Sequence, residues 1–111
     1  MKKISLIILL LLLSSFAYAN PIIKTYGQTK DYTVDYINNY DLKGLKYILV
    51  YPDSYSNYWW GQYYPNQIIL YSSKEYVFAH ELAHHYNYLE TKNYQQHTDN
   101  FYKCLEEINE K

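Results

Sequence analysis

The chain has few of the features that usually stabilise or anchor a small protein. Its only cysteine among 111 residues is Cys104, so no disulfide can form within one molecule. A domain of this size is near the lower limit for a self-sufficient hydrophobic core, and a bound metal is one way to add stability. Arginine is absent, and beyond Lys2 and Lys3 only eight lysines accompany eleven acidic residues. No basic patch is visible, which argues against a nucleic-acid-binding protein.

The first 19 residues have the organisation of a secretory signal peptide. Lys2 and Lys3 form a positive start, residues 4–13 are apolar except for Ser5, and Ala-Tyr-Ala at 17–19 is a small-residue cleavage site. A retained membrane anchor is the alternative, but the apolar run is shorter than the ~20 residues that span a bilayer. We therefore expect cleavage before Asn20, export to the periplasm or the extracellular space, and no membrane span afterwards.

Residues 20–111 are predicted to form a single, monomeric α+β domain. Residues 20–28 look extended or loose. Hydrophobic periodicity predicts a first helix, strand composition predicts a small antiparallel sheet of two or three strands, and a last helix follows near the C-terminus. The expected boundaries are Thr29 to Tyr40 for the first helix, then Leu45 to Tyr51, Gly61 to Tyr64 and Gln67 to Tyr71 for the strands, with a turn at Pro65-Asn66, and Thr98 to Glu110 for the last helix.

A helix carrying His-Glu-x-x-His is the most informative feature of the sequence. No glycine or proline interrupts the chain after Ser72, and Ser72 with Glu75 fits a capping box, with Ser73 as a rival cap. On a helix, His80 and His84 lie one turn apart on one face, so both imidazoles can reach one ion. Glu81 lies beside them, where it can take a proton from a metal-bound water.

The same spacing also occurs on ordinary solvated helices. Here, however, all four histidines fall between positions 80 and 97, and apolar residues surround the motif. We therefore predict a zinc site with His80 and His84 as ligands and Glu81 as the catalytic general base.

A catalytic zinc site needs a third protein ligand, and His97 is the leading candidate. It stands at the start of the last predicted helix, which can fold back beside the motif helix, with Phe101 turned into the core. Carboxylates are the alternatives to His97: Asp99, Glu106 and Glu107. His85 points to another face of the helix, so we expect it to support the site indirectly or to lie at the surface.

The order of these segments resembles the core of the SprT-like metallopeptidases, which are zincins. The similarity spans about residues 45–108 and rests on Gly-Gln-Tyr at 61–63, Ile-Ile-Leu at 68–70, the His-Glu-x-x-His motif, and His97 with Phe101. The resemblance implies a zincin-like fold, a zinc cofactor and peptide hydrolysis by a minimal core. The chain has Thr98 where this family commonly has glycine, and it has no zinc ribbon or DNA-binding tail.

These features together predict a secreted or periplasmic zinc metallopeptidase, and an endopeptidase in particular, that acts on peptides or proteins. An extended substrate is expected to pair with the sheet edge near residues 63–71, and a tyrosine (Tyr86, Tyr94 or Tyr102) is available for the oxyanion. The alternative is an exported binding module whose zinc is structural, closed by a fourth ligand such as Asp99 or Glu90. A third interpretation, suggested by the seventeen tyrosines, is an aromatic adhesion domain without metal.

Overall fold

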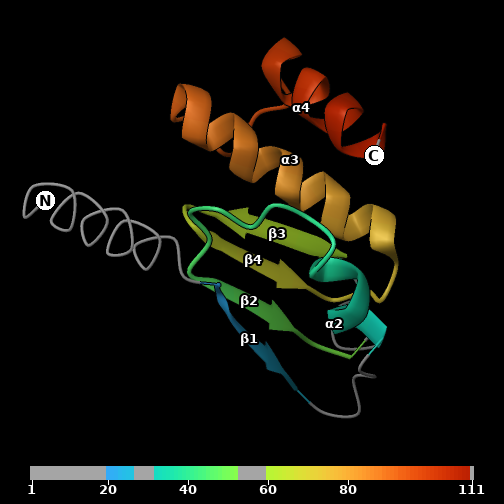
Figure 1. The fold of residues 1–111 in the computed structure, drawn as a ribbon. Coiled ribbons are helices and arrows are strands. Elements are labelled where there is room, and N and C mark those ends of the chain that lie inside the picture. The colour runs from blue at the N-terminus through green and yellow to red at the C-terminus, as the bar shows by residue number, and fades with distance from the viewer. Residues whose placement is uncertain (1–19, 27–31, 53–59, 111) are drawn as a thin grey trace, which may run out of the picture.

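A four-stranded mixed sheet and two long helices organise the chain (Figure 1). The structure, a computed structural model, describes residues 20–26, 32–52 and 60–110. The predicted signal peptide, residues 1–19, lies outside the described residues. Within the described ranges, no helix has both the length and the apolar character needed to cross a membrane.

The sheet is mostly parallel, so the predicted antiparallel sheet is wrong for two of its three strand pairs. Its strands are β1 (Ile22–Thr25), β2 (Tyr47–Val50), β3 (Gly61–Tyr64) and β4 (Gln67–Leu70), arranged in the order β1-β2-β4-β3. β1 pairs with β2 and β2 with β4 in parallel, and only β3 with β4 is antiparallel. The β3–β4 hairpin turns at the predicted Pro65-Asn66, where Asn66 takes a positive φ of 66°.

The first described element is the strand β1, so the prediction that the domain begins with a helix is wrong. Within the predicted range, the described helix is the short α2 (Tyr32–Ile37), which joins β1 to β2; residues 29–31 lie outside the description. After Ile37 the backbone N–H groups of Asn39 and Tyr40 donate to carbonyl oxygens three residues earlier, at 3.1 and 3.2 Å. The helix therefore ends in turns. β1 and β2 are parallel neighbours, and parallel neighbours need a crossover connection, which is usually helical.

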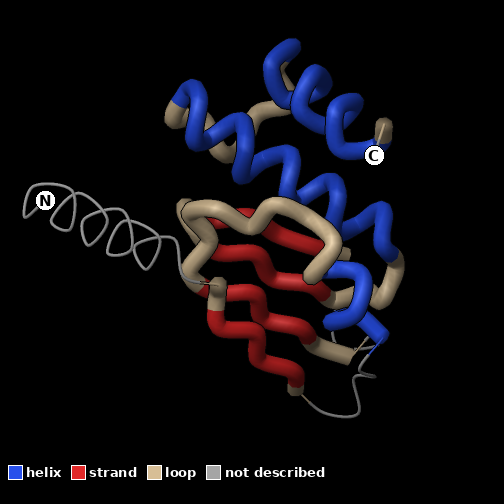
Figure 2. The backbone as a smooth tube through the Cα atoms, viewed as in Figure 1, coloured by secondary structure: helices blue, strands red, loops and turns tan. Residues whose placement is uncertain are grey.

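The motif helix lies in the middle of the molecule. α3 (Glu75–Thr91) packs on β3 and β4, and α4 (Asp99–Asn109) packs on the other side of α3 (Figure 2). The last helix was predicted correctly, and Thr98 caps it by accepting a hydrogen bond from the N–H of Phe101 at 3.2 Å. The predicted capping box of α3 is wrong, since α3 begins after Lys74 and Ser72 accepts from the N–H of Lys74 instead.

The hydrophobic core lies between the sheet and α3 and continues between α3 and α4. Ile48, Val50, Ile68 and Leu70 alternate along β2 and β4, which directs them to one face of the sheet. Phe78 and Leu82 from α3 and Phe101, Cys104 and Ile108 from α4 complete it. Because α3 is covered on two sides, its polar residues Glu81, His84, His85 and Asn87 are buried too.

Candidate metal centre

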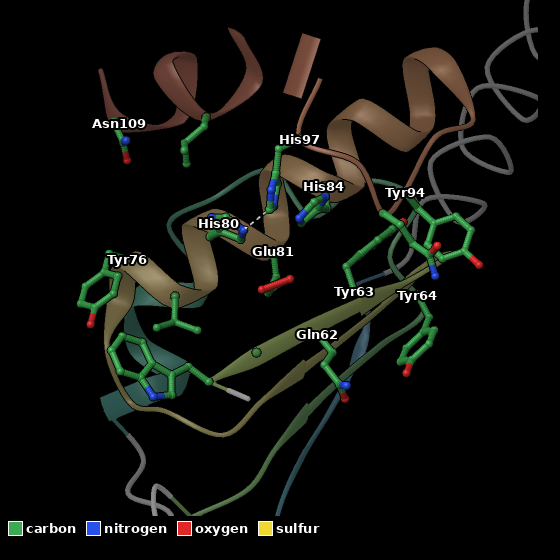
Figure 3. A pocket seen from close by; sticks show the side chains of 15 residues that line it. Gln62, Tyr63, Tyr64, Tyr76, His80, Glu81, His84, Tyr94, His97 and Asn109 are labelled. Atoms are coloured by element: carbon green, nitrogen blue, oxygen red, sulfur yellow. Dashed lines mark hydrogen bonds between the residues drawn. The ribbon is translucent and has the colours of Figure 1, made fainter. Parts of the chain in front are cut away.

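The three predicted ligands meet at one place in the fold. His80 and His84 lie one turn apart on α3, and His97 comes from the connection between α3 and α4 (Figure 3). One ring nitrogen from each lies within 4.8 Å of the other two. The Nε2 atoms of His80 and His97 are 3.2 Å apart. The structure therefore brings together a cluster of three imidazoles that could hold a metal ion.

Phe101 forms the floor beneath the three rings. Its side chain is fully buried, and its ring centroid lies 5.0 Å from that of His80, 4.4 Å from His84 and 4.8 Å from His97. An apolar floor of this kind excludes water from one side of the cluster and restricts the ring rotamers. The predicted inward orientation of Phe101 is confirmed.

Burial favours the neutral form of the histidines of α3. Desolvation first, and then the neighbouring His80 and His97, lower the pKa of His84 to about 4. Desolvation and then His97 lower the pKa of His80 as well. Neutral imidazoles offer free lone pairs, which is the form that binds a metal.

One donor pair of the cluster has the spacing that two ligands of a zinc ion would have. Two Zn–N bonds of ~2.0–2.1 Å at a tetrahedral angle place their nitrogens ~3.3 Å apart, close to the 3.2 Å between His80 and His97. Nδ1 of His84 is buried and has no hydrogen-bond partner among the described residues, which is rare for a buried polar atom.

The motif carboxylate lies beside the sheet at the bottom of the cluster. Glu81 is only 6 % exposed, and burial raises the pKa of its carboxyl group to about 8. A Cβ atom on Gly61 of β3 would be 3.0 Å from both Cγ and Oε2 of Glu81 and 2.9 Å from Cγ1 of Val77. Gly61 is therefore needed for its small size, because β3 passes directly against the carboxyl group.

The cluster opens into a cleft of about 900 Å³ between α3, α4 and β3. All four residues of β3 line this cleft, and Trp60, Tyr76 and Tyr94 add aromatic walls. β3 is the last strand of the sheet, so one of its edges is free of a strand partner among the described residues. Glu81 is the one carboxylate among the described residues that line it.

His85 is neither a ligand nor a surface residue. It is fully buried, its Nε2 lies 2.7 Å from the carbonyl oxygen of Lys43, and its Nδ1 lies 2.6 Å from the hydroxyl of Tyr63. A carbonyl can only accept, so Nε2 carries the proton and Nδ1 accepts from Tyr63. The Tyr63 hydroxyl also accepts from the N–H of Asn66 at 2.9 Å. His85 thus joins β3 to α3 behind the cluster.

The alternative ligands do not join the cluster in the part of the chain that the structure describes. Asp99, Glu106 and Glu107 are exposed on α4 and absent from the group that surrounds His80. Glu90 accepts a hydrogen bond from Asn100 at 2.9 Å. Of the three tyrosines considered for the oxyanion, Tyr94 lines the cleft, whereas the Tyr86 hydroxyl donates to the carbonyl of Asp41.

Sequence reasoning gave no role in the site to three residues that shape it: Gly61, Tyr63 as the partner of His85, and Asn87. Only Asn87 left a local signal, since it is the next polar residue on the face of α3 that carries His80 and His84. Gly61 and Tyr63 act across the gap between β3 and α3, which no spacing in the sequence reveals.

Comparison of the chain with profiles of known protein families, with curated proteins and with solved structures found no match, so the argument for function rests on the geometry of the three-histidine cluster.

Proposed function

We propose that this protein is an exported zinc-dependent metallopeptidase that hydrolyses peptide bonds. His80, His84 and His97 hold the zinc ion and Glu81 is the general base. The observation that carries the proposal is the convergence of three imidazoles at the mouth of a cleft that also contains one buried carboxylate. A purely structural ion would have no use for that carboxylate.

The chain's own residues account for the proton transfers. When bound, zinc supplies a Lewis acid that polarises a carbonyl group and makes coordinated water more acidic. Glu81 follows His80 directly on α3. On the cleft side it takes a proton from the attacking water and returns it to the leaving amine. Burial raises the pKa of Glu81 to about 8, and the positive charge of a bound ion would lower it.

The free edge of β3 supports a peptide or protein as the substrate. An extended peptide can pair with the unused backbone groups of an edge strand, which holds it along the cleft without demanding a particular sequence. The cleft runs past the three histidines and is walled by tyrosine and tryptophan side chains, with no lysine among its described lining residues. Such walls suit an uncharged, extended chain.

The structural-zinc alternative needs a fourth protein ligand. The cluster of described residues provides three, and neither Asp99 nor Glu90 lines the cleft. Three protein ligands with an open fourth position is the arrangement of catalytic zinc sites.

A pair of variants tests the function. Glu81→Gln keeps the shape of the side chain but removes its basicity, so it should bind zinc and cleave an unfolded-protein mixture ~10²–10⁴-fold more slowly than wild type. His80→Ala should lose both zinc and cleavage. Wild-type cleavage in Glu81→Gln, with zinc confirmed in both proteins, would remove Glu81 from the mechanism. No cleavage by wild type, with zinc tightly bound, would favour the structural-zinc module.

Export is tested separately from activity. The charged start, apolar run and Ala-Tyr-Ala site predict that the protein isolated from its native host begins at Asn20. Intact-mass measurement of the secreted or periplasmic fraction checks this. An N-terminus at Met1 in a membrane fraction would contradict export by cleavage.

A further inference from the structure

The third histidine is held differently from the other two. The helical backbone of α3 places His80 and His84, but His97 lies in the connection after α3 and is exposed to solvent. Whether its ring stays within reach of the other two depends on how firmly this connection, residues 92–98, is attached to α3.

A single buried side chain on α3, that of Asn87, attaches the connection to the helix on both sides of His97. Asn87 is fully buried and follows His80 and His84 along the same helical face. Its Nδ2 donates to the backbone carbonyl of Asn93 at 3.1 Å, and its Oδ1 accepts from Nδ2 of Asn100 at 2.8 Å. Because a carbonyl can only accept, the bond to Asn93 determines which way the Asn87 amide points.

The two attachment points are themselves ordered by local hydrogen bonds. Oδ1 of Asn93 accepts from the N–H groups of Gln95 at 3.3 Å and Gln96 at 3.0 Å, which closes a turn immediately before His97. Thr98 caps α4 immediately after it. His97 therefore stands between two short, closed turns, and both are bonded to Asn87.

We propose that Asn87 is a positioning residue for the metal centre: it holds His97 in place before the ion arrives. The proposal rests on the three-histidine site of the proposed function. A ligand that is already in position loses little conformational freedom on binding, so the affinity for the ion is higher. An asparagine that served only the packing of α3 would affect unfolding but not the zinc affinity of the folded protein.

A double-mutant cycle on zinc affinity tests this role. The affinity is measured by competition with a chelating dye for wild type, Asn87→Leu, His97→Ala and the double variant, with folding followed by circular dichroism. Asn87→Leu should weaken zinc binding by ~10–100-fold, the usual effect of removing a group that orients a ligand. In the His97→Ala background the same substitution should cause no further loss, since Asn87 acts through His97.

Two further variants keep the test decisive. Of the two bonds that attach the connection to Asn87, Asn100→Ala removes only the one on the α4 side, together with the hydrogen bonds from Asn100 to Glu90 and Cys104. This variant should fold where Asn87→Leu does not and should weaken zinc binding by a smaller factor. Ile48→Val in the core of the sheet should lower stability and leave zinc affinity unchanged.

Unchanged affinity in Asn87→Leu, or in Asn100→Ala if only that variant folds, would overturn the proposal. An equal loss of zinc affinity on Asn87→Leu in the presence and absence of His97 would overturn it too. If His97→Ala itself binds zinc like wild type, the three-histidine site is wrong, which is a separate failure.

Discussion

Under the proposed mechanism, replacing Gly61 with alanine is expected to slow peptide cleavage while leaving the three-histidine cluster intact. The new Cβ atom would lie 2.9 Å from Cγ1 of Val77 and 3.0 Å from both Cγ and Oε2 of Glu81. Ordinary carbon contacts lie at ~3.5–4.0 Å, so each contact must open by roughly 0.5–1 Å. Val77 and Glu81 are both buried, so either the carboxyl group moves or β3 separates from α3.

The expected magnitudes follow from these contacts. Overpacking a buried position typically costs ~1–3 kcal/mol in the free energy of unfolding. A shift of a catalytic group by ~1 Å can cost ~10²-fold in rate. Zinc affinity should not change, because no atom of the three histidines is among those nearest to the added methyl group.

Three measurements on Gly61→Ala check this reasoning: urea unfolding, zinc affinity, and the rate of cleavage of an unfolded-protein mixture. Gly44→Ala is the matched control. Gly44 has a φ of +84°, and a Cβ there would lie 3.3 Å from side-chain atoms of His85 and Leu89, so this variant should lose stability but not the cleavage rate of the folded protein. A wild-type rate in zinc-loaded, folded Gly61→Ala would refute the argument, and lost zinc would show that the added methyl group disturbs α3, which carries His80 and His84.

Two other predictions concern the histidines and the buried acid. His97→Ala should lose zinc affinity. His85→Ala should keep most of it but melt at a lower temperature, because His85 is fully buried and bonded on both ring nitrogens. Zinc content and thermal melts of both variants test this, and the reverse pattern would contradict the site. Burial raises the pKa of Glu81 from 4.5 to about 8 in the metal-free fold, so the stability that depends on its protonated form is complete below pH 4.5 and is lost as the pH rises through about 8. Metal-free Glu81→Gln, which cannot ionise, should therefore lose less stability than wild type between these pH values in urea titrations, and parallel curves would show that Glu81 is not protonated in the fold.

Several parts of the fold could be read from local sequence. The motif helix, the last helix, the Pro65-Asn66 turn and the strands β2, β3 and β4 all depend on residues close together in the chain. The strand β1 was missed because four residues after Pro21 are too few to show a period. The parallel pairing was missed because it depends on which distant strand lies beside β2, and strand patterns do not encode the order of strands in a sheet.

The candidate site, like the fold, could be predicted from the sequence only in part. The sequence alone determined that His80 and His84 share one helical face with Glu81 beside them, since helical geometry requires it. Only the tertiary structure decided that His97 reaches them, that Glu81 lies against Gly61, and that His85 is buried. These contacts join α3 to a strand and a connection that lie outside the helix. Their positions depend on how α3 packs between the sheet and α4, and this packing brings a helix, an edge strand and a loop together around one cleft.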